Sequence, residues 1–378
     1  MKILLTGGGS GGHFYPIIAV AQELRDVSKE KKIIDPTLFF FAPSPYNEKL
    51  LYDNQIYFKK VPSGKRRNYR SALNFLDFFK TFYGVILGLW KVFWEYPDVI
   101  FSKGGYGSFP IVFAGRILGI PIVIHESDSV PGRVNMWAGK FAHRIALSYP
   151  DSAKYFPEEK TAWTGNPVRK EVEMVPQRGA KEFLNLEPDT PVILVLGGSQ
   201  GAKLINEIIL DSLPRLIKKF QIIHQTGVDN FDEVSTVASA ILQDSEFKKR
   251  YRPFKYLDNL AMRMSAGAAD IVITRAGSTL FEVALWEIPS IIIPITNSAG
   301  NHQRKNAYTY ARSGAGIVID ESNLSDDILI AQINAILDNE ETYESMSMAA
   351  KSFAKPEASK TIAEEIIETA LSHHKSKK

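Results

Sequence analysis

The stretch from Lys2 to His13 reads Lys-Ile-Leu-Leu-Thr-Gly-Gly-Gly-Ser-Gly-Gly-His, and it decides the fold class of the chain. A short apolar run passes directly into a glycine-rich loop, and the helical pattern Pro16–Val27 follows. This order of strand, glycine-rich turn and helix is typical of parallel α/β folds. Glycine lets the backbone approach a ligand closely, and the unpaired N–H groups of a helix start attract phosphate. We therefore expect Gly7–His13 to form part of an active site.

The spacing of Gly7, Gly9 and Gly12 also matches the G-x-G-x-x-G pattern of dinucleotide sites. A dehydrogenase with this pattern should carry an acidic residue about 20 residues further on, at the end of the second strand. The predicted second strand, Leu38–Ala42, continues instead into Pro-Ser-Pro. The sequence therefore argues against a dinucleotide-dependent dehydrogenase.

Apolar runs alternate with helical patterns along the whole chain, which predicts parallel sheets with crossover helices. The predicted strands are Lys2–Thr6, Leu38–Ala42, Val99–Lys103, Ile120–His125, Arg144–Ser148, Val192–Leu196, Gln221–Gln225, Ile271–Thr274, Ser290–Pro294 and Gly316–Ile319. The Gly165–Arg169 segment interrupts the alternation, and 378 residues exceed the usual size of one core. We expect an α/β protein with two Rossmann-like domains facing each other across a cleft. The predicted domains are residues 1–164 and 165–355, and residues 356–378 form a helix and basic tail that packs back on the first domain.

Composition is that of an ordinary folded protein, with 45% hydrophobic and 23% charged residues. The net charge of +3 is too small to require a nucleic-acid partner. There are no cysteines, which excludes disulfides, thiolate metal sites and cysteine nucleophiles. Only three apolar residues follow Lys2, fewer than the roughly 7–15 of a secretory signal. We expect a cytoplasmic protein.

Two further glycine-rich loops follow predicted strands, Gly104–Ser108 and Gly197–Ala202. Each loop taken alone could be a plain tight turn, but together they favour a site divided between a nucleotide in one domain and an acceptor in the other. Glu282 could accept hydrogen bonds from ribose or simply match a helix dipole, and Asn301–Ala307 could bind sugar hydroxyls or cap a helix. No Asp-x-Asp motif occurs, so we expect no metal or other cofactor, and Arg169 would neutralise a diphosphate.

Six motifs occur in the order of one family: Gly7–His13, His125-Glu126, Gly165–Arg169, Gly197–Ala202, Arg275–Glu282 and Asn301–Ala307. From Lys2 to about Ala354, the chain resembles the MurG family of bacterial peptidoglycan glycosyltransferases, in glycosyltransferase family 28. The resemblance implies a GT-B fold and inverting transfer of N-acetylglucosamine from UDP-N-acetylglucosamine. The implied acceptor is the C4 hydroxyl of undecaprenyl-diphosphate-linked N-acetylmuramoyl-pentapeptide, in peptidoglycan synthesis.

The resemblance also implies a role for each matching position. Ser10, Gly11 and Gly12 would lie near the donor sugar and diphosphate, and His13 would lie at the reaction centre. Arg169 and Ser199 would contact the diphosphate, the backbone of Leu257 the uracil, Glu282 the ribose, and Gln303 the sugar hydroxyls. The other expected substrate contacts are Tyr106, Asp128, Gln200, Ser278, Thr279, Leu280 and Asn306.

Three departures from the family pattern affect these expectations. The family commonly has His-Glu-Gln-Asn where this chain has His-Glu-Ser-Asp, so Asp128 replaces an amide. The Arg275–Glu282 motif is one residue shorter than usual, which leaves its register open, and Ser10 stands for a threonine. His13 is the first candidate for the catalytic base because imidazole titrates near pH ~6.5. Glu126 and Asp128 are rival bases, and His13 could instead only orient phosphate.

The segment between Ser71 and Trp94 is crowded with large apolar residues and follows four basic residues between 65 and 70. Asp77, Lys80 and Lys91 interrupt it, so it is not a membrane span. We expect mainly core packing, with part of the segment docking on an anionic membrane, which would place the protein peripherally at the cytoplasmic face of the plasma membrane.

Three other functions fit parts of the sequence. A UDP-glucose or UDP-galactose transferase acting on diacylglycerol would accommodate the divergent Ser127-Asp128 pair. A UDP-N-acetylglucosamine 2-epimerase would share the two-domain architecture without a lipid acceptor. A nucleotide-sugar-binding regulatory module would need no base, whereas the candidate base His13 is present.

Overall fold

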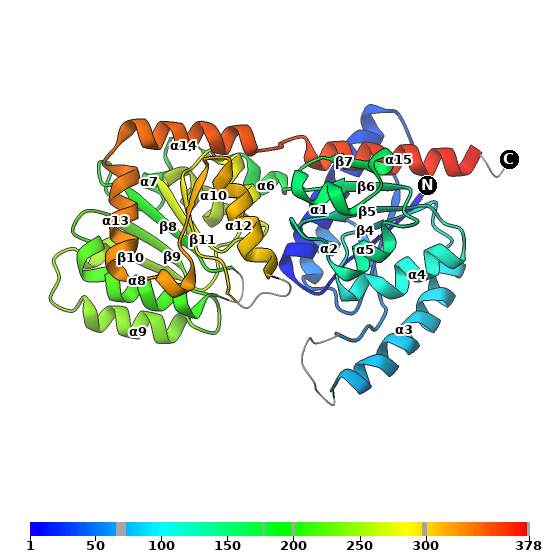
Figure 1. Ribbon diagram of the computed structural model, residues 1–378, viewed down its shortest axis with the longest axis horizontal. Helices are drawn as coiled ribbons and strands as arrows, with labels where there is room; N and C mark the ends of the chain where they lie inside the picture. Colours follow the sequence, from blue (N-terminus) through cyan, green and yellow to red (C-terminus); the bar gives the residue numbers. More distant parts are fainter. Residues whose placement is uncertain (66–72, 177, 199–200, 297–300, 376–378) are drawn as a thin grey trace. The chain divides into compact units, whose positions relative to one another are not determined.

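The apolar runs form two parallel β-sheets in the computed structural model, which describes residues 1–65, 73–176, 178–198, 201–296 and 301–375 (Figure 1). The chain divides into two units: unit 1 comprises Met1–Arg169 and Lys355–Lys378, and unit 2 comprises Lys170–Ala354. Each unit has one sheet with helices on both faces. Both are therefore Rossmann-like α/β units, as the sequence predicted.

The unit 1 sheet has seven strands among the described residues, in the order β3-β2-β1-β4-β5-β6-β7. Their bounds are β1 Lys2–Thr6, β2 Thr37–Ala42, β3 Ile56–Lys60, β4 Val99–Ser102, β5 Ile122–Glu126, β6 Arg144–Leu147 and β7 Thr161–Trp163. All neighbours are parallel, and Leu4 in β1 is in register with Phe39 and Ile100. Because parallel strands end at one edge, the loops after β1, β4 and β5 are brought together there.

Alternating residues of β1 separate the two cores of unit 1. Ile3 and Leu5 pack with helices α1 (Gly11–Glu30) and α15 (Ala358–Lys375). Leu4 packs on the other face, which α3 (Leu73–Glu95), α4 (Phe109–Ile117) and α5 (Arg133–Ala138) cover. A short helix, α2 (Glu48–Asp53), precedes β3. The C-terminal helix therefore completes the core of unit 1 although it is last in the sequence.

The unit 2 sheet has six strands among its described residues, in the order β10-β9-β8-β11-β12-β13. Their bounds are β8 Val192–Leu196, β9 Gln221–Gln225, β10 Tyr251–Phe254, β11 Ile271–Thr274, β12 Ser290–Ile292 and β13 Gly316–Val318. The helices are α6 Lys170–Glu173, α7 Ala180–Phe183, α8 Lys203–Leu216, α9 Phe231–Ile241, α10 Asn259–Ala268, α11 Thr279–Leu285, α12 His302–Arg312, α13 Asp326–Leu337 and α14 Glu340–Phe353. This sheet is also parallel throughout.

All ten predicted strands are present; four have the predicted bounds, and the ends of the others differ by one or two residues. Three strands were missed: β3, β7 and β10. Each is short, lies at an edge of its sheet, and carries polar residues that obscure the apolar pattern. The first helix also begins at Gly11 rather than Pro16, so Gly11, Gly12 and His13 form its first turn.

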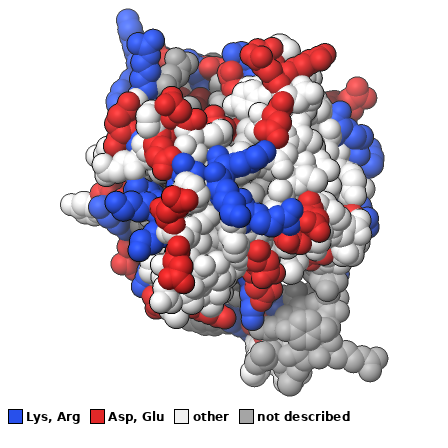
Figure 2. Space-filling view, turned by 90° about the vertical axis from the view of Figure 1, so that its left-hand side faces the viewer, with Lys and Arg blue, Asp and Glu red and all other residues white. Residues whose placement is uncertain are grey.

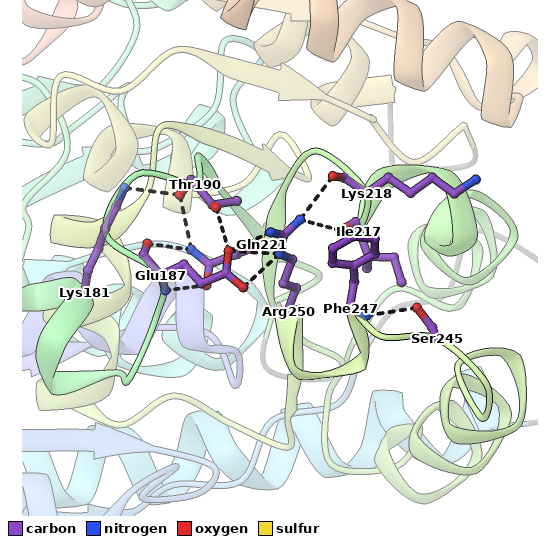
Figure 3. A network of polar contacts seen from close by, with 9 residues as sticks. All are labelled: Lys181, Glu187, Thr190, Ile217, Lys218, Gln221, Ser245, Phe247 and Arg250. Atoms are coloured by element: carbon purple, nitrogen blue, oxygen red, sulfur yellow. Dashed lines mark hydrogen bonds and ion pairs between the residues drawn. The ribbon is translucent and has the colours of Figure 1, made fainter.

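A network of charged and amide side chains fixes the segment before β8 in unit 2 (Figure 3). Arg250 donates to Glu187 at 2.7 Å and to the carbonyls of Ile217 and Lys218. The Gln221 side chain accepts from the N–H of Glu187 and donates to two carbonyls of the same segment. This network lies at the beginning of β9, at the amino edge of the sheet, and its polar groups bind one another. It stabilises the fold.

Candidate active site

Helix α1 holds His13 in its first turn. The N-cap residue Ser10 has an extended backbone, and its carbonyl accepts from the N–H groups of His13 and Phe14 at 3.0 Å. The Ser10 hydroxyl lies 2.8 Å from Nδ1 of His13, within hydrogen-bond distance. This contact orients the ring, so the tight turn after β1 positions an imidazole at the carboxyl edge of the sheet.

The glycines of the first two loops allow these loops to pack directly on each other. Gly105 has φ +79°, and a Cβ there would lie 2.8 Å from Cα of Gly8 and 3.1 Å from Nε2 of His13. A Cβ on Gly107 would lie 2.7 Å from the carbonyl oxygen of Gly7. Tyr106 belongs to the same loop, and a Cβ on Gly9 would approach its hydroxyl to 2.9 Å. Gly105 and Gly107 are therefore needed for backbone contact around the His13 ring, whereas the contact at Gly9 is with the far end of a side chain.

Glu126 lies at the end of β5 with its carboxylate buried. One oxygen accepts from the N–H of Asp128, and the other accepts from the N–H of Gly132 and the amide of Asn135, all at 3.0 Å. Burial raises the pKa of Glu126 to about 7, the charge of Asp128 adds to this increase, and the three hydrogen bonds oppose it. Through these hydrogen bonds, Glu126 holds the backbone of the segment from residue 126 to 132, which carries the half-buried Asp128.

His125 is fully buried beneath this segment. Its Nε2 lies 3.0 Å from the carbonyl oxygen of Gly165 and 3.2 Å from the hydroxyl of Ser148. Burial lowers the pKa of His125 well below its ordinary value, and the charge of Lys103 adds to the decrease. His125 is therefore neutral near pH 7, and it ties the end of β5 to the segment that leads out of unit 1.

Four buried polar residues of this region were missed by the sequence reasoning: Lys103, Asn135, Ser148 and Asn166. Lys103 offered a signal, because it is a cation at the end of an otherwise apolar run and directly before the second glycine loop.

The predicted Arg169 belongs to unit 1, where it is buried with its guanidinium 4.1 Å from the centre of the Tyr15 ring.

In unit 2, the predicted uracil contact Leu257 lies in the loop after β10. Its N–H donates to the Gln225 side chain at 3.0 Å, and the amide of Gln225 donates to the carbonyl of Gly198 at 3.3 Å. Gln225 therefore links the loop after β10 to the third glycine loop. The predicted contacts Ser199 and Gln200 of that loop lie outside the described residues.

The remaining predicted donor contacts lie where β11 and β12 end. Ser278 precedes α11 as its N-cap, Thr279 begins the helix, and Glu282 is half-buried in its first turn. Leu280 is fully buried, so only its backbone could contact a ligand. The Gln303 side chain accepts from the N–H of Ile295 at 3.2 Å, and the buried Asn306 donates to the carbonyl of Ala276 at 3.3 Å. These amides connect α12 to the two loops.

Solved structures share this arrangement of two parallel sheets. MurG from Acinetobacter baumannii matches 97% of this chain and 99% of its own, with a TM-score of 0.71 and 23% identity. A complex of S. aureus MnaA with UDP matches 99% and 98%, with a TM-score of 0.71 and 17% identity. The UDP-GlcNAc 2-epimerase from Neisseria meningitidis matches 97% and 100%, with a TM-score of 0.67 and 15% identity. The fold is the GT-B fold of two-domain glycosyltransferases and related enzymes.

Sequence comparison narrows this class to one family. Residues 3–147 match the glycosyltransferase family 28 N-terminal domain, and residues 192–362 match the family 28 C-terminal domain. Curated relatives include proteins named UDP-N-acetylglucosamine–N-acetylmuramyl-(pentapeptide) pyrophosphoryl-undecaprenol N-acetylglucosamine transferase. One from Clostridium botulinum is 33% identical over 90% of this chain and 92% of its own length. One from Bacillus cereus, whose name ends in "transferase 2", is 35% identical over 97% of this chain and 99% of its own length. The chain belongs to glycosyltransferase family 28 and is a transferase.

Proposed function

We propose that this enzyme transfers N-acetylglucosamine from UDP-N-acetylglucosamine to undecaprenyl-diphosphate-linked N-acetylmuramoyl-pentapeptide. The proposal rests on the 33–35% identity of this chain to transferases named for this reaction, over nearly the full length of both proteins. In this proposal the acceptor C4 hydroxyl attacks the anomeric carbon, UDP leaves, and the configuration at that carbon inverts. Unit 2 binds the donor through the loops after β8, β10, β11 and β12, and unit 1 binds the acceptor.

His13 acts as the base that takes the proton from the acceptor hydroxyl. Its Nδ1 lies 2.8 Å from the Ser10 hydroxyl, which fixes the orientation of the ring, and the proposal assigns the proton transfer to Nε2, the ring nitrogen near Gly105. Glu126 is a poorer base, because both of its oxygens already accept hydrogen bonds and the side chain is buried. Asp128 is more exposed than Glu126 and contacts the acceptor in this proposal.

A transfer assay tests the reaction directly. Labelled UDP-N-acetylglucosamine is incubated, without added metal, with a short-chain analogue of the muramoyl lipid or with diacylglycerol. Label in the muramoyl lipid is the expected result. Label in diacylglycerol alone, or release of free N-acetylmannosamine, replaces the proposal with a different transferase or with an epimerase.

Replacement of His13 by Ala tests the base. Loss of a general base costs about 10²–10⁴-fold in rate, so kcat should fall by at least that lower value. A decrease below about tenfold removes His13 from this role. Binding of UDP to unit 2, measured by calorimetry, should be the same in wild type and variant and serves as the control.

Helix α3 is the proposed contact with the membrane. Its stripe Gly84, Gly88 and Val92 is buried, and a Cβ on Gly84 would overlap the carbonyl of Pro62. Because this stripe is narrow, most of the large apolar side chains of the helix are exposed: Phe75, Leu76, Phe78, Phe79, Phe82, Tyr83, Ile86, Trp90, Phe93 and Trp94 are each 53–67% exposed. The expected core packing of this segment is therefore wrong for most of its large side chains.

An exposed apolar face of this size is typical of a surface that binds a partner or a lipid bilayer. The charged face drawn in Figure 2 is different, because Lys and Arg are interspersed there with Asp and Glu. Of the basic flank, Lys65 is exposed, and the other three residues lie outside the described part of the chain. Among the described residues, no helix combines the length and the apolar character that crossing a bilayer requires. The α3 face therefore supports docking on the membrane surface.

Vesicle co-sedimentation tests this docking. Replacement of Phe78, Phe82 and Trp90 by Ser should weaken binding to vesicles with anionic lipid by at least about tenfold, because less apolar surface leaves water. A matched control replaces the exposed Val237 and Ile241 of α9 by Ser and should bind as the wild type does. Equal binding of all three proteins, or equal binding to neutral and anionic vesicles, contradicts the proposed docking on anionic lipid.

A further inference from the structure

Lys103 is a buried cation to which the proposed reaction assigns no role. It follows β4 directly and is only 1% exposed, and its N–H donates to the carbonyl of Thr6 at 2.9 Å. Its position is thus at the carboxyl end of two central strands, directly before the second glycine loop. Lysine is almost never fully buried without a compensating partner, so its presence here calls for a physical reason.

Hydrogen bonding does not supply that reason. Within the described part of the chain, Nζ of Lys103 makes one long hydrogen bond, 3.4 Å to Oδ1 of Asn166, and no direct ion pair. The same Asn166 oxygen accepts from the Ser148 hydroxyl at 3.4 Å, and Ser148 lies 3.2 Å from the buried imidazole of His125. These neighbours are neutral, so they cannot balance the charge of an ammonium group.

The charge of Lys103 is offset by the two carboxylates after β5. Lys103 follows Ser102, which is in register with Ile124 of the neighbouring strand β5, so Lys103 and Glu126 both lie at the carboxyl end of adjacent strands. Burial lowers the pKa of Lys103 to about 8, and the negative charges of Glu126 and then Asp128 oppose that decrease. The ammonium form therefore predominates at pH 7. Glu126 in turn receives the N–H groups of Asp128 and Gly132, so its charge and position determine the course of the segment between them.

We propose that Lys103 is a positioning residue whose buried ammonium balances Glu126 and Asp128 and thereby holds the segment 126–132 in the conformation that receives the acceptor. This inference rests on the proposed function, in which Asp128 contacts the acceptor. Without the cation, the charge of Asp128 is no longer offset, so the buried Glu126 takes up a proton near pH 7. A protonated Glu126 accepts the N–H groups of Asp128 and Gly132 less well, so the segment shifts and the acceptor geometry is lost.

A double-mutant cycle with Lys103→Met and Asp128→Asn tests the proposal. Lys103→Met should lower kcat/KM for the muramoyl lipid analogue by about 10- to 100-fold, as for other tightly coupled charges, and KM for UDP-N-acetylglucosamine should stay unchanged. The double variant should be no worse than Asp128→Asn alone, because it removes one charge of each sign. The proposal would be overturned if the effects of the two single substitutions on kcat/KM multiplied in the double variant. It would also be overturned if Lys103→Met raised the KM of the donor as much as it lowered kcat/KM for the acceptor.

A second cycle, on the free energy of unfolding, separates this proposal from the proposed function. The same variants should again be non-additive, and additivity would overturn charge balance whatever the acceptor is. If the wild type transfers no sugar to the muramoyl lipid, the proposed function fails while the stability cycle still decides whether Lys103 balances the carboxylates. If Lys103→Met does not fold, folding of the double variant supports the proposal and its failure overturns it.

Lys59→Met is the matched control. Lys59 lies on β3 of the same sheet, away from the loops that follow β1, β4 and β5, and pairs with Glu95 at the end of α3. Its replacement likewise removes one lysine charge from unit 1. It should leave kcat/KM within about twofold of the wild type, since it leaves the carboxylates after β5 untouched.

Discussion

Replacing Glu126 by Gln should change how the stability of the protein depends on pH. Burial and the Asp128 charge raise the pKa of Glu126 from 4.5 to about 7. Between these two values the folded protein keeps a proton that the unfolded chain releases. The Glu126 contribution to the free energy of unfolding is therefore fully present below pH 4.5 and is lost as pH rises to 7.

The size of this effect follows from the shift. A difference of 2.5 pKa units, from 4.5 to 7, corresponds to roughly 3 kcal/mol at about 1.4 kcal/mol per unit. Glutamine carries no titrating proton, so the free energy of unfolding of the variant does not lose this contribution as pH rises. It also presents an NH₂ group to one of the backbone or amide donors around Glu126, which destabilises it by an amount that does not vary with pH.

Urea unfolding at a series of pH values from 4.5 to 8 measures the effect. Four of the five tryptophans, Trp90, Trp94, Trp137 and Trp163, belong to unit 1, so intrinsic fluorescence mainly follows its unfolding. The difference between wild type and Glu126→Gln should decrease by up to about 3 kcal/mol over this range.

Two controls make the test specific. In an Asp128→Asn background, the stability difference that Glu126→Gln makes should change less with pH, because the Asp128 charge contributes to the raised pKa of Glu126. Glu187→Gln should show no such slope between pH 5 and 7, because Arg250 lowers the pKa of Glu187 instead. A constant difference between wild type and Glu126→Gln at every pH would refute the reasoning and show that Glu126 titrates as an exposed carboxyl.

Other substitutions test separate parts of the structure. Gly105→Ala should destabilise unit 1 by more than about 1 kcal/mol and abolish transfer, because φ is +79° and the new Cβ would meet Gly8. Gly132→Ala is the control and should have neither effect, because its Cβ would enter open space. Equal melting temperatures of the two variants would contradict this prediction. His224 has its pKa lowered by burial to about 3, so wild-type unit 2 should lose up to about 5 kcal/mol as pH falls from 6.5 toward 3. His224→Gln should lose less, and parallel acid unfolding curves for the two proteins would show that His224 is not buried as a neutral ring.

Local sequence was sufficient for the parallel α/β class and for most of its strands. Apolar runs such as Lys2–Thr6 and Val192–Leu196 are buried on both faces, and their glycine-rich continuations are local turns that need no distant partner to be recognised. Three of the four edge strands were missed, and each of them, such as Tyr251–Phe254, carries polar or partly exposed residues that obscure the apolar pattern. The family motifs likewise indicated which loops we propose as the site.

Tertiary structure alone decided the environment of each side chain in those loops. Glu126 was a candidate base by sequence, and its burial against Asn135 and two backbone N–H groups makes it a structural carboxylate. Helix α3 was apolar enough for a core, yet its glycine stripe packs closely and leaves its aromatic residues exposed. Burial and charge balance depend on residues far apart in the chain, so Lys2–His13 could indicate the fold but could not reveal that Lys103 lies buried near the same sheet edge.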